Sequence, residues 1–321
     1  MALSHDSNCT SVSFESTLVG VAVLAVTLQE PALSGDGLTI ASRDWITLYP
    51  LNHANNPLKT RSITLIRADM NSESWNQLEF PSSDVTVTQI TGAWGKLTIF
   101  NIYNDGEWED TVNLLTDYHH RHSEALEHTT IGEAHIMWIG DFNRHHPLWD
   151  SPTDTRLFTN LATEAAEKLI EAVTDAGLVL ALPNGIPTHE HNVTKRWTRL
   201  DQVFITAHSS ELLITCSTLP EQRGINTDHL PILTELRLEI ATAGTKAVEN
   251  FRNVNWEDFR DELRKQLSKA KKPTHITTQA QLDECCEELM KALQEAIRVA
   301  VPTDEITPKS KRWWTKELSH L

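Results

Sequence analysis

Short runs of apolar or alternating residues recur through the first 240 residues of this chain, with turn-forming residues between them. Runs of this length are typical of β-strands rather than of helices. We predict strands at Val19–Leu28, Ile63–Ala68, Val85–Ile90, Leu97–Tyr103, His135–Ile139, Leu178–Leu182, Leu200–Thr206, Leu212–Cys216 and Ile232–Ile240. Glu107–Glu127 and Thr153–Ala176 instead carry apolar residues at helical spacing, and Gly177 stands where the second helix would end. Many strands with few helices predict two sheets packed face to face, with helices outside.

The character of the sequence changes after residue 240. Residues 241–245 resemble a linker, and Asn255–Ala270 and Thr278–Val301 have the pattern of two charged amphipathic helices. The 321 residues exceed the length of one typical domain. We therefore expect one α/β (α+β) domain over residues 1–240 and a helical extension over residues 241–321.

Charge is distributed unevenly between these two parts. The whole chain carries −16, from 28 Lys and Arg against 44 Asp and Glu. Residues 241–321 hold 14 basic and 13 acidic residues, so residues 1–240 carry 14 − 31 = −17. Proteins that bind DNA by displacing counterions from its phosphates need a basic surface. The negative net charge of residues 1–240 argues against tight non-specific DNA binding, but it does not exclude a local basic stripe.

Neither the cysteines nor the apolar run near the N-terminus indicates secretion or a membrane. The cysteines at positions 9, 216, 285 and 286 form no CxxC pair, which fits a reducing intracellular compartment. Leu18–Leu28 is too short to span a bilayer as a helix, and it lacks the basic start and the cleavage site of a signal peptide. We expect an intracellular protein with no membrane partner.

Polar residues stand at the ends of five predicted strands. They are Glu30, Tyr103, Asp141 with Asn143, Asp201, and Asp228 with His229. Carboxylate and amide oxygens are the ligands that hard divalent cations prefer, and a histidine beside an aspartate can transfer a proton or contact a phosphate. Each residue alone would be an ordinary turn or strand-end residue. Together they predict a site for metal-assisted phosphoryl transfer.

The motifs that carry these residues resemble, in order, the endonuclease/exonuclease/phosphatase family. They resemble in particular its retrotransposon branch, the non-LTR endonucleases linked to a reverse transcriptase. The motifs are LQEP, NIYND, IGDFNRHHPLWD, WTRLDQVFIT and TDHLPI, over roughly residues 26–236. The third is the most specific, because its Asp-Phe-Asn run continues into a dense polar and aromatic cluster. Near the C-terminus, KSKRWWTKEL resembles the segment that joins such endonucleases to the polymerase.

The resemblance implies a four-layer α/β/β/α sandwich of two mixed sheets, with the site at one rim between the sheets. It also implies a metal-dependent endonuclease that nicks target DNA for retrotransposition. Mg²⁺ would be the cofactor, with Mn²⁺ as a substitute. The partners would be duplex DNA and, in a full-length element, a C-terminal reverse transcriptase to which residues 241–321 lead. A nuclear location follows from the same reading.

The family's metal and water positions correspond to four residues of this chain. Glu30 would bind Mg²⁺, and Asp228 would lie near the same metal cluster. Asp141 and Asn143 would position or activate the attacking water and hold the scissile phosphate.

The phosphate contacts correspond to three more residues, and one position departs from the family pattern. His229 would contact the phosphate or exchange a proton, oriented by Asp201, and Tyr103 would contact the phosphate. The family opens with a strand that ends in Gln-Asn. Here Asn8 is the nearest match, without a clear strand before it, so either Asn8 fills this role or the first strand is degenerate or missing.

Two alternatives remain open from the sequence. The chain could be a catalytically inactive, degraded retroelement fragment that acts through protein interactions alone. It could also be a phosphodiesterase or phosphatase of the same family that acts on a non-DNA or abasic-DNA substrate.

Overall fold

The computed structural model describes residues 24–40, 42–106, 110–225, 227–238, 246–270 and 275–306. The chain divides into two compact units, Met1–Thr242 and Ala243–Leu321.

A six-stranded mixed sheet forms the centre of the first unit. Its strand order is β4 (Trp75–Leu78), β5 (Val85–Gly92), β6 (Gly95–Tyr103), β7 (Glu133–Asp141), β11 (Asp201–Thr206) and β8 (Leu178–Leu180). Strands β6 and β7 run parallel, and the other neighbours are antiparallel. The parallel step is made through the helix that lies between β6 and β7 in the chain, the usual crossover for parallel strands.

Two smaller sheets pack against one face of this central sheet. One has the order β1 (Ala25–Gln29), β3 (Ser62–Arg67), β2 (Trp45–Leu48), and the other pairs β12 (Leu213–Thr218) with β13 (Ile232–Leu236). Both contribute to one buried cluster with the central sheet. Its members include Ala25, Ile66, Leu97, Ile99, Met137, Ile139, Val203, Ile205, Cys216 and Ile232. The first unit therefore contains the predicted face-to-face packing of sheets.

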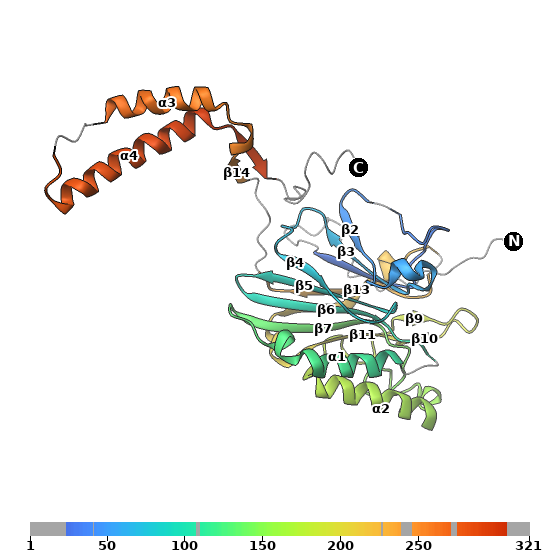
Figure 1. Cartoon of the computed structure of the whole chain (residues 1–321). Helices are drawn as coiled ribbons and strands as arrows, with labels where there is room; N and C mark the ends of the chain where they lie inside the picture. The colour runs from blue at the N-terminus through green and yellow to red at the C-terminus, as the bar shows by residue number, and fades with distance from the viewer. Residues whose placement is uncertain are drawn as a thin grey trace. The chain divides into compact units, whose positions relative to one another are not determined.

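Helices α1 (Asp110–Glu127) and α2 (Asn160–Asp175) cover the opposite face of the central sheet, as Figure 1 shows. A second buried cluster fills this interface, with Val112, Leu115 and Leu169 from the helices against Phe100 and Trp138 from the sheet. The fold class is thus confirmed as α+β with two sheet layers.

The expected α/β/β/α sandwich has a helical layer on each outer side. In the described residues of the first unit, the α-helices are α1 and α2, which form one of these layers, and the other layer is not seen there. The segments that connect β1, β2 and β3 contain short 3₁₀ turns, His53–Asn55 and Pro57–Lys59. Pro31, Pro50, Gly35 and Gly37 interrupt these segments, and such residues prevent a long helix.

The predicted elements are found, with two kinds of difference. Helix α2 begins at Asn160 and not at Thr153, because the hydroxyl of Thr159 accepts a hydrogen bond from the Ala162 N–H at 3.2 Å and caps the helix there. Strands β2 and β4, and the two-residue strands β9 (His189–Glu190) and β10 (Trp197–Thr198), were not predicted. Residues 19–23 of the first predicted strand lie outside the described part.

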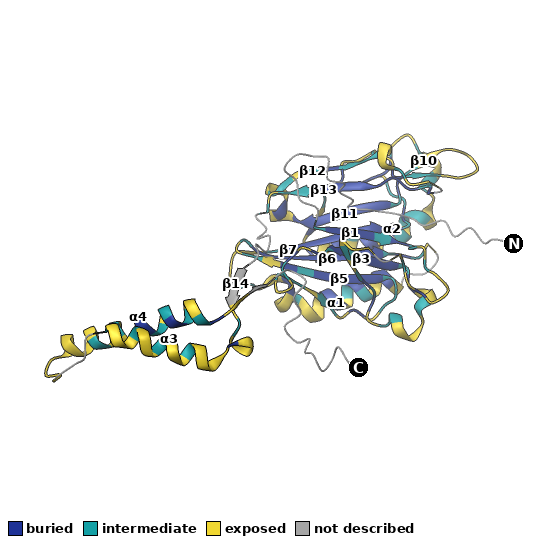
Figure 2. Ribbon diagram, turned by 90° about the horizontal axis from the view of Figure 1, so that it is seen from above, coloured by how far each residue is buried: buried dark blue, intermediate teal, exposed yellow. Residues whose placement is uncertain are grey.

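In the second unit, α3 (Trp256–Lys269) and α4 (Gln279–Ala300) pack on each other, and β14 (Lys246–Glu249) pairs with β15 (Thr303–Ile306). Asn255 caps α3, and Thr278 with Gln281 forms a capping box on α4. Both helices show long exposed faces in Figure 2, whereas the strands of the central sheet are buried. Throughout the described ranges, every helix is too short or too polar to cross a bilayer.

Candidate active site

Three of the predicted site residues stand in one row across the central sheet. Tyr103, at the end of β6, pairs in register with Asp141, at the end of β7, and Asp141 pairs with Asp201, at the start of β11. Side chains that face each other across neighbouring strands lie on the same face of a sheet, a few ångströms apart. The strand order, rather than the sequence distance, therefore brings these residues together.

The row faces the second sheet layer. Ile139 and Val203 lie two residues from Asp141 and Asp201 and belong to the core between the sheets. Because strand side chains alternate between faces, the two aspartates continue that core surface at its rim. Gly140 permits the close approach of β7 to β6, since its φ is +144° and a Cβ there would lie 1.9 Å from the carbonyl oxygen of Ile102.

His229 approaches the row from the segment before β13. Its Nδ1 lies 2.8 Å from Oδ2 of Asp201, and both side chains are buried. The Thr227 hydroxyl accepts the His229 N–H, and the Thr188 hydroxyl accepts the Asp201 N–H, each at 3.2 Å. The Asp201 carboxylate accepts the Nδ1 proton, so Nε2 faces away from it and toward Asp228.

The charges around His229 and Asp141 shift both pKa values upward. Burial by itself would lower the pKa of His229, but the carboxylate of Asp201, with smaller contributions from Asp141 and Asp228, raises it to about 9. Burial and the charge of Asp201 raise the pKa of Asp141 to about 7, and Glu30 adds to this rise. Groups that titrate near neutral pH are suited to proton transfer.

Glu30 leaves β1 in a left-handed conformation, with φ +47°, and its N–H donates to the Arg61 carbonyl at 2.8 Å. This backbone region is uncommon for residues other than glycine, and such residues often occur at functional sites. Burial raises the pKa of the Tyr103 phenol, and the charge and a hydrogen bond of Glu30 raise it further. Glu30 therefore lies within electrostatic reach of Tyr103 and Asp141, as the strand-end pattern predicts.

Arg61 supports this side of the site and was not predicted from the sequence. Its guanidinium lies 4.6 Å from the ring centroid of Tyr103 and binds both carboxylate oxygens of Asp84, at 2.9 and 2.8 Å. It also donates to Asp105 at 2.6 Å. Two carboxylates hold the cation in place over the phenol.

Asn143 lies in the turn after β7, also in a left-handed conformation, with φ +49°. Its N–H donates to Oδ1 of Asp141 at 3.0 Å, and its side-chain amide donates to the Asn104 carbonyl at 2.9 Å. Asn104 in turn donates to the Phe142 carbonyl at 2.7 Å. Asn143 therefore fixes the turn that presents Asp141. Asn8 lies outside the described residues.

Asp228 and His189 lie next to His229 at the edge of the site. Oδ2 of Asp228 lies 3.6 Å from Nε2 of His189 and accepts from the Asn192 amide at 2.9 Å, and Oδ1 lies 4.0 Å from Nε2 of His229. His189 belongs to the two-residue strand β9 and was not predicted from the sequence. Its signal is the run Thr188–Asn192 (THEHN), which is rich in polar and metal-ligating residue types.

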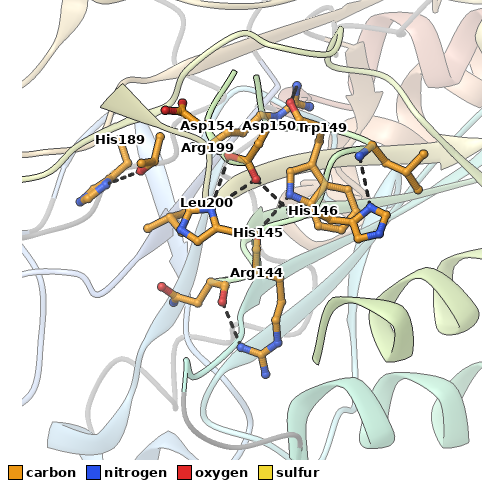
Figure 3. A network of polar contacts seen from close by, with 12 residues as sticks. Arg144, His145, His146, Trp149, Asp150, Asp154, His189, Arg199 and Leu200 are labelled. Atoms are coloured by element: carbon orange, nitrogen blue, oxygen red, sulfur yellow. Dashed lines mark hydrogen bonds and ion pairs between the residues drawn. The ribbon is translucent and has the colours of Figure 1, made fainter. Parts of the chain in front are cut away.

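The polar and aromatic cluster after Asn143 folds into a closed loop around Asp150, as Figure 3 shows. The Asp150 carboxylate accepts from the backbone N–H of His146 at 3.0 Å and of Arg199 at 3.2 Å. The buried Trp149 donates from Nε1 to the Arg144 carbonyl at 3.0 Å. This loop joins the Asp141 turn to the segment that leads to Asp201, so the cluster serves to position the site.

The oxygen-rich side of the site fits a hard divalent cation. Asp141 lies near the negative charges of Asp201 and Glu30, and a cation would offset that repulsion. Oδ1 of Asp228 and Oδ1 of Asn104 are buried and have no hydrogen-bond partner within the described residues. Carboxylate and amide oxygens of this kind are the ligands that Mg²⁺ prefers.

Comparison with solved structures gives distant matches. The endonuclease domain of TRAS1, a telomere-specific non-LTR retrotransposon, is 14% identical, with a TM-score of 0.48, and the match covers 62% of this chain and 82% of that one. The AP endonuclease LMAP from Leishmania major is 12% identical, with a TM-score of 0.48 and coverages of 61% and 72%. The catalytic domain of APE2 from Xenopus laevis is 14% identical, with a TM-score of 0.48 and coverages of 69% and 85%.

Comparison with curated proteins gives no match. A family model does match, over residues 97–233, and this range runs from β6 through Tyr103, Asp141, Asp201 and His229 into β13. Residues 97–233 match the family described as endonuclease-reverse transcriptase, as the motifs of the sequence predict.

Proposed function

We propose that the first unit is a Mg²⁺-dependent phosphodiesterase that nicks duplex DNA and leaves a 3′-hydroxyl end. The observation that carries this proposal is the row of half-buried Tyr103 with buried Asp141 and Asp201, joined to His229 at one rim of two packed sheets. Acidic, phenolic and imidazole groups in this arrangement suit in-line attack of water on a phosphate diester.

Asp141 is the group that accepts a proton from water in this proposal, because its raised pKa, about 7, lets it exchange protons near neutral pH. The water oxygen then bonds to phosphorus, and the bond from phosphorus to the 3′ oxygen breaks. The departing oxygen takes a proton from solvent water and becomes the 3′-hydroxyl, and the phosphate remains as the 5′-phosphate of the other strand end.

His229 stabilises the phosphate charge that builds up during attack. Its pKa of about 9 keeps the ring protonated at neutral pH, and Asp201 holds the ring so that Nε2 is turned toward Asp228. Tyr103, whose phenol stays protonated because its pKa is raised, adds a neutral hydrogen-bond donor. Fixed donors of this kind lower the barrier without needing to reorient during the reaction.

Glu30 and Asp228 are the residues proposed to hold Mg²⁺, with Mn²⁺ as a substitute. When bound, the ion supplies electrostatic stabilisation of the phosphate and of the departing oxygen. Glu30 is suited to this role because its charge acts on both Tyr103 and Asp141.

DNA is the proposed substrate despite the acidic balance of residues 1–240. The exposed turn between β9 and β10 carries Lys195 and Arg196 close in sequence to His189 and Asn192. A local basic turn of this kind can contact phosphates even when the net charge is negative. On this reading the domain acts in the nucleus, and residues 241–321 lead to a reverse transcriptase in the full-length element.

A plasmid-nicking assay with Mg²⁺ tests the proposal. Wild type should convert supercoiled plasmid to the nicked form, and Asp141→Ala and His229→Ala should each abolish this conversion. Asp117→Asn, exposed on α1, is the matched control and should behave as wild type. Nicking that survives both site substitutions would exclude the assigned site.

Two other outcomes correspond to the alternatives that the sequence leaves open. Faster turnover of an abasic duplex or a phospholipid head group than of supercoiled DNA would assign a different substrate to the same site. Absence of nicking together with absence of thermal stabilisation by Mg²⁺ would indicate an inactive fragment, because a ligand of the folded state must raise its apparent stability.

A further inference from the structure

His189 and His229 lie side by side at the rim of the site, with Asp228 next to both rings. The two histidines form an isolated antiparallel bridge, and their ring centroids are 4.8 Å apart. One ligand atom from each of the three side chains lies within 4.8 Å of the other two. A tetrahedral zinc ion with bonds of about 2.1 Å holds its ligand atoms about 3.4 Å apart. Nε2 of His189 lies 3.6 Å from Oδ2 of Asp228, and Nε2 of His229 lies 4.0 Å from Oδ1 of the same carboxylate, so the cluster would have to contract around one of these oxygens to complete such a set.

Each of the three side chains is held by a further contact. Nδ1 of His229 is bound to Asp201 at 2.8 Å, and Nδ1 of His189 is 3.0 Å from the Thr198 hydroxyl. These contacts leave both Nε2 atoms facing Asp228, whose Oδ2 accepts from the Asn192 amide. Metal-binding histidines usually bond their second nitrogen to a carboxylate or a neutral oxygen in this way, which fixes the ring and its tautomer.

A second observation also points to a cation. Oδ1 of Asp228 is buried and finds no hydrogen-bond partner in the described part of the chain. A buried carboxylate oxygen without a partner costs free energy, and a metal ion would satisfy it.

Another histidine pair in the chain is less suited to an ion. In the group of Glu133, His135 and His208, one nitrogen of each ring is also held, with Nε2 of His208 bound to the Ala134 carbonyl at 2.9 Å and Nδ1 of His135 to the Ser209 hydroxyl at 2.7 Å, but His208 is exposed to solvent. Glu133 is exposed. This pair therefore provides a control within the same molecule.

We infer that His189, Asp228 and His229 form a binding site for a nitrogen-preferring divalent ion such as Zn²⁺, and that its occupation inhibits the phosphodiesterase reaction. Two imidazoles and one carboxylate are a typical zinc ligand set, whereas Mg²⁺ prefers oxygen ligands. A bound ion would occupy Nε2 of His229 and would compete for Asp228. The inhibitory part of this inference rests on the proposed function, and the binding part does not.

Direct titration with Zn²⁺ alone tests the binding part. The full chain should bind one ion tightly at this site, and His189→Gln should weaken that binding by more than the 10–100-fold typical of losing a supporting contact. Thr198→Val removes such a contact and should weaken binding by about 10-fold. His208→Gln should leave the affinity unchanged. The melting temperature of each variant without metal establishes whether it is folded. If His189→Gln is unfolded, Thr198→Val takes its place as the test of the site.

Unchanged Zn²⁺ affinity in His189→Gln, or in Thr198→Val where the first variant is unfolded, would overturn the site. Loss of binding in His208→Gln alone would assign the ion to the other pair and would also overturn it.

Addition of Zn²⁺ to the Mg²⁺-dependent nicking assay tests the inhibitory part. Wild type and His208→Gln should lose activity as the site fills, and His189→Gln should need at least about 10-fold more Zn²⁺ for the same fractional loss, in line with its weaker binding. Equal Zn²⁺ sensitivity in all three proteins would overturn the inhibition. Zn²⁺ binding that depends on His189, in a chain that nicks no DNA under any condition, would leave the metal site standing and reject the proposed function.

Discussion

Nδ1 of His229 lies 2.8 Å from Oδ2 of Asp201, with side-chain exposures of 2% and 0%. The two residues are 28 positions apart in the chain, and each is anchored by a hydrogen bond from its own N–H to a threonine hydroxyl. A buried carboxylate in this place fixes the tautomer of the ring and stabilises its protonated form. The pair therefore links the geometry of the site to its dependence on pH.

Asp201→Asn should lower the nicking rate by about 10³-fold, because an amide neither stabilises the imidazolium of His229 nor enforces one tautomer. Asp201 raises the pKa of His229 to about 9, so its removal should lower that pKa. The alkaline side of the pH–rate profile of any residual activity should then move to lower pH. Measurement of the rate from about pH 6 to pH 10 checks this, and an alkaline limb that stays in place would contradict the assigned role.

Asp141→Asn should abolish nicking and yet stabilise the fold at pH 8 in the absence of metal. The folded state raises the pKa of Asp141 from 3.8 to about 7, so the ionised carboxylate is disfavoured in the folded protein. The contribution of this carboxyl group to the free energy of unfolding is therefore full at low pH and is lost as the pH rises through 7. The variant should therefore gain about 1–3 kcal/mol at pH 8 and almost nothing near pH 4. Urea denaturation at both pH values measures the difference, and a loss of stability at pH 8 would show that the charge is well paired.

The strand-end pattern leads to most of the proposed site, because polar residues at the rim of a sheet must follow or precede buried strands. Glu30, Tyr103, Asp141, Asp201 and His229 all stand at such positions. The strand order, in which β7 lies between β6 and β11, could not be predicted from the sequence alone. That order decides which strand ends become neighbours, and it depends on long-range packing.

The missed residues share a physical reason. His189 lies in a strand of two residues, and Arg61 stands before β3 without any motif around it, so neither has a periodic signal. Strands β2 and β4 are at sheet edges, where one side of the strand lacks a partner and polar residues such as Asn76 and Gln77 interrupt the apolar alternation. Pairing with the adjacent strands β3 and β5, rather than the pattern of their own residues, determines these two strands.

Glu30→Gln should weaken the binding of Mg²⁺ to the protein. In wild type, Mg²⁺ should raise the melting temperature in a concentration-dependent way, since it binds the folded state. The variant should show a much smaller rise and should need at least about 10-fold more Mg²⁺ for half-maximal nicking. Glu164→Gln, exposed on α2, is the control. An equal Mg²⁺ response in both variants would remove Glu30 from the metal site.

Trp149→Phe tests whether the loop after Asn143 positions the site through its own hydrogen bonds. Phenylalanine keeps most of the buried ring but loses the Nε1 donor, which leaves the Arg144 carbonyl without that bond. An unsatisfied buried carbonyl costs about 1–3 kcal/mol, so the free energy of unfolding should fall by that amount. Because this loop leads directly from the Asp141 turn, the nicking rate should fall as well, although less than in Asp141→Asn. Trp138→Phe, at a buried ring whose Nε1 has no hydrogen-bond partner among the described residues, controls for the loss of ring volume and should cost less stability. Equal destabilisation by the two substitutions would mean that the loss of ring volume, rather than the loss of the Arg144 hydrogen bond, accounts for the effect.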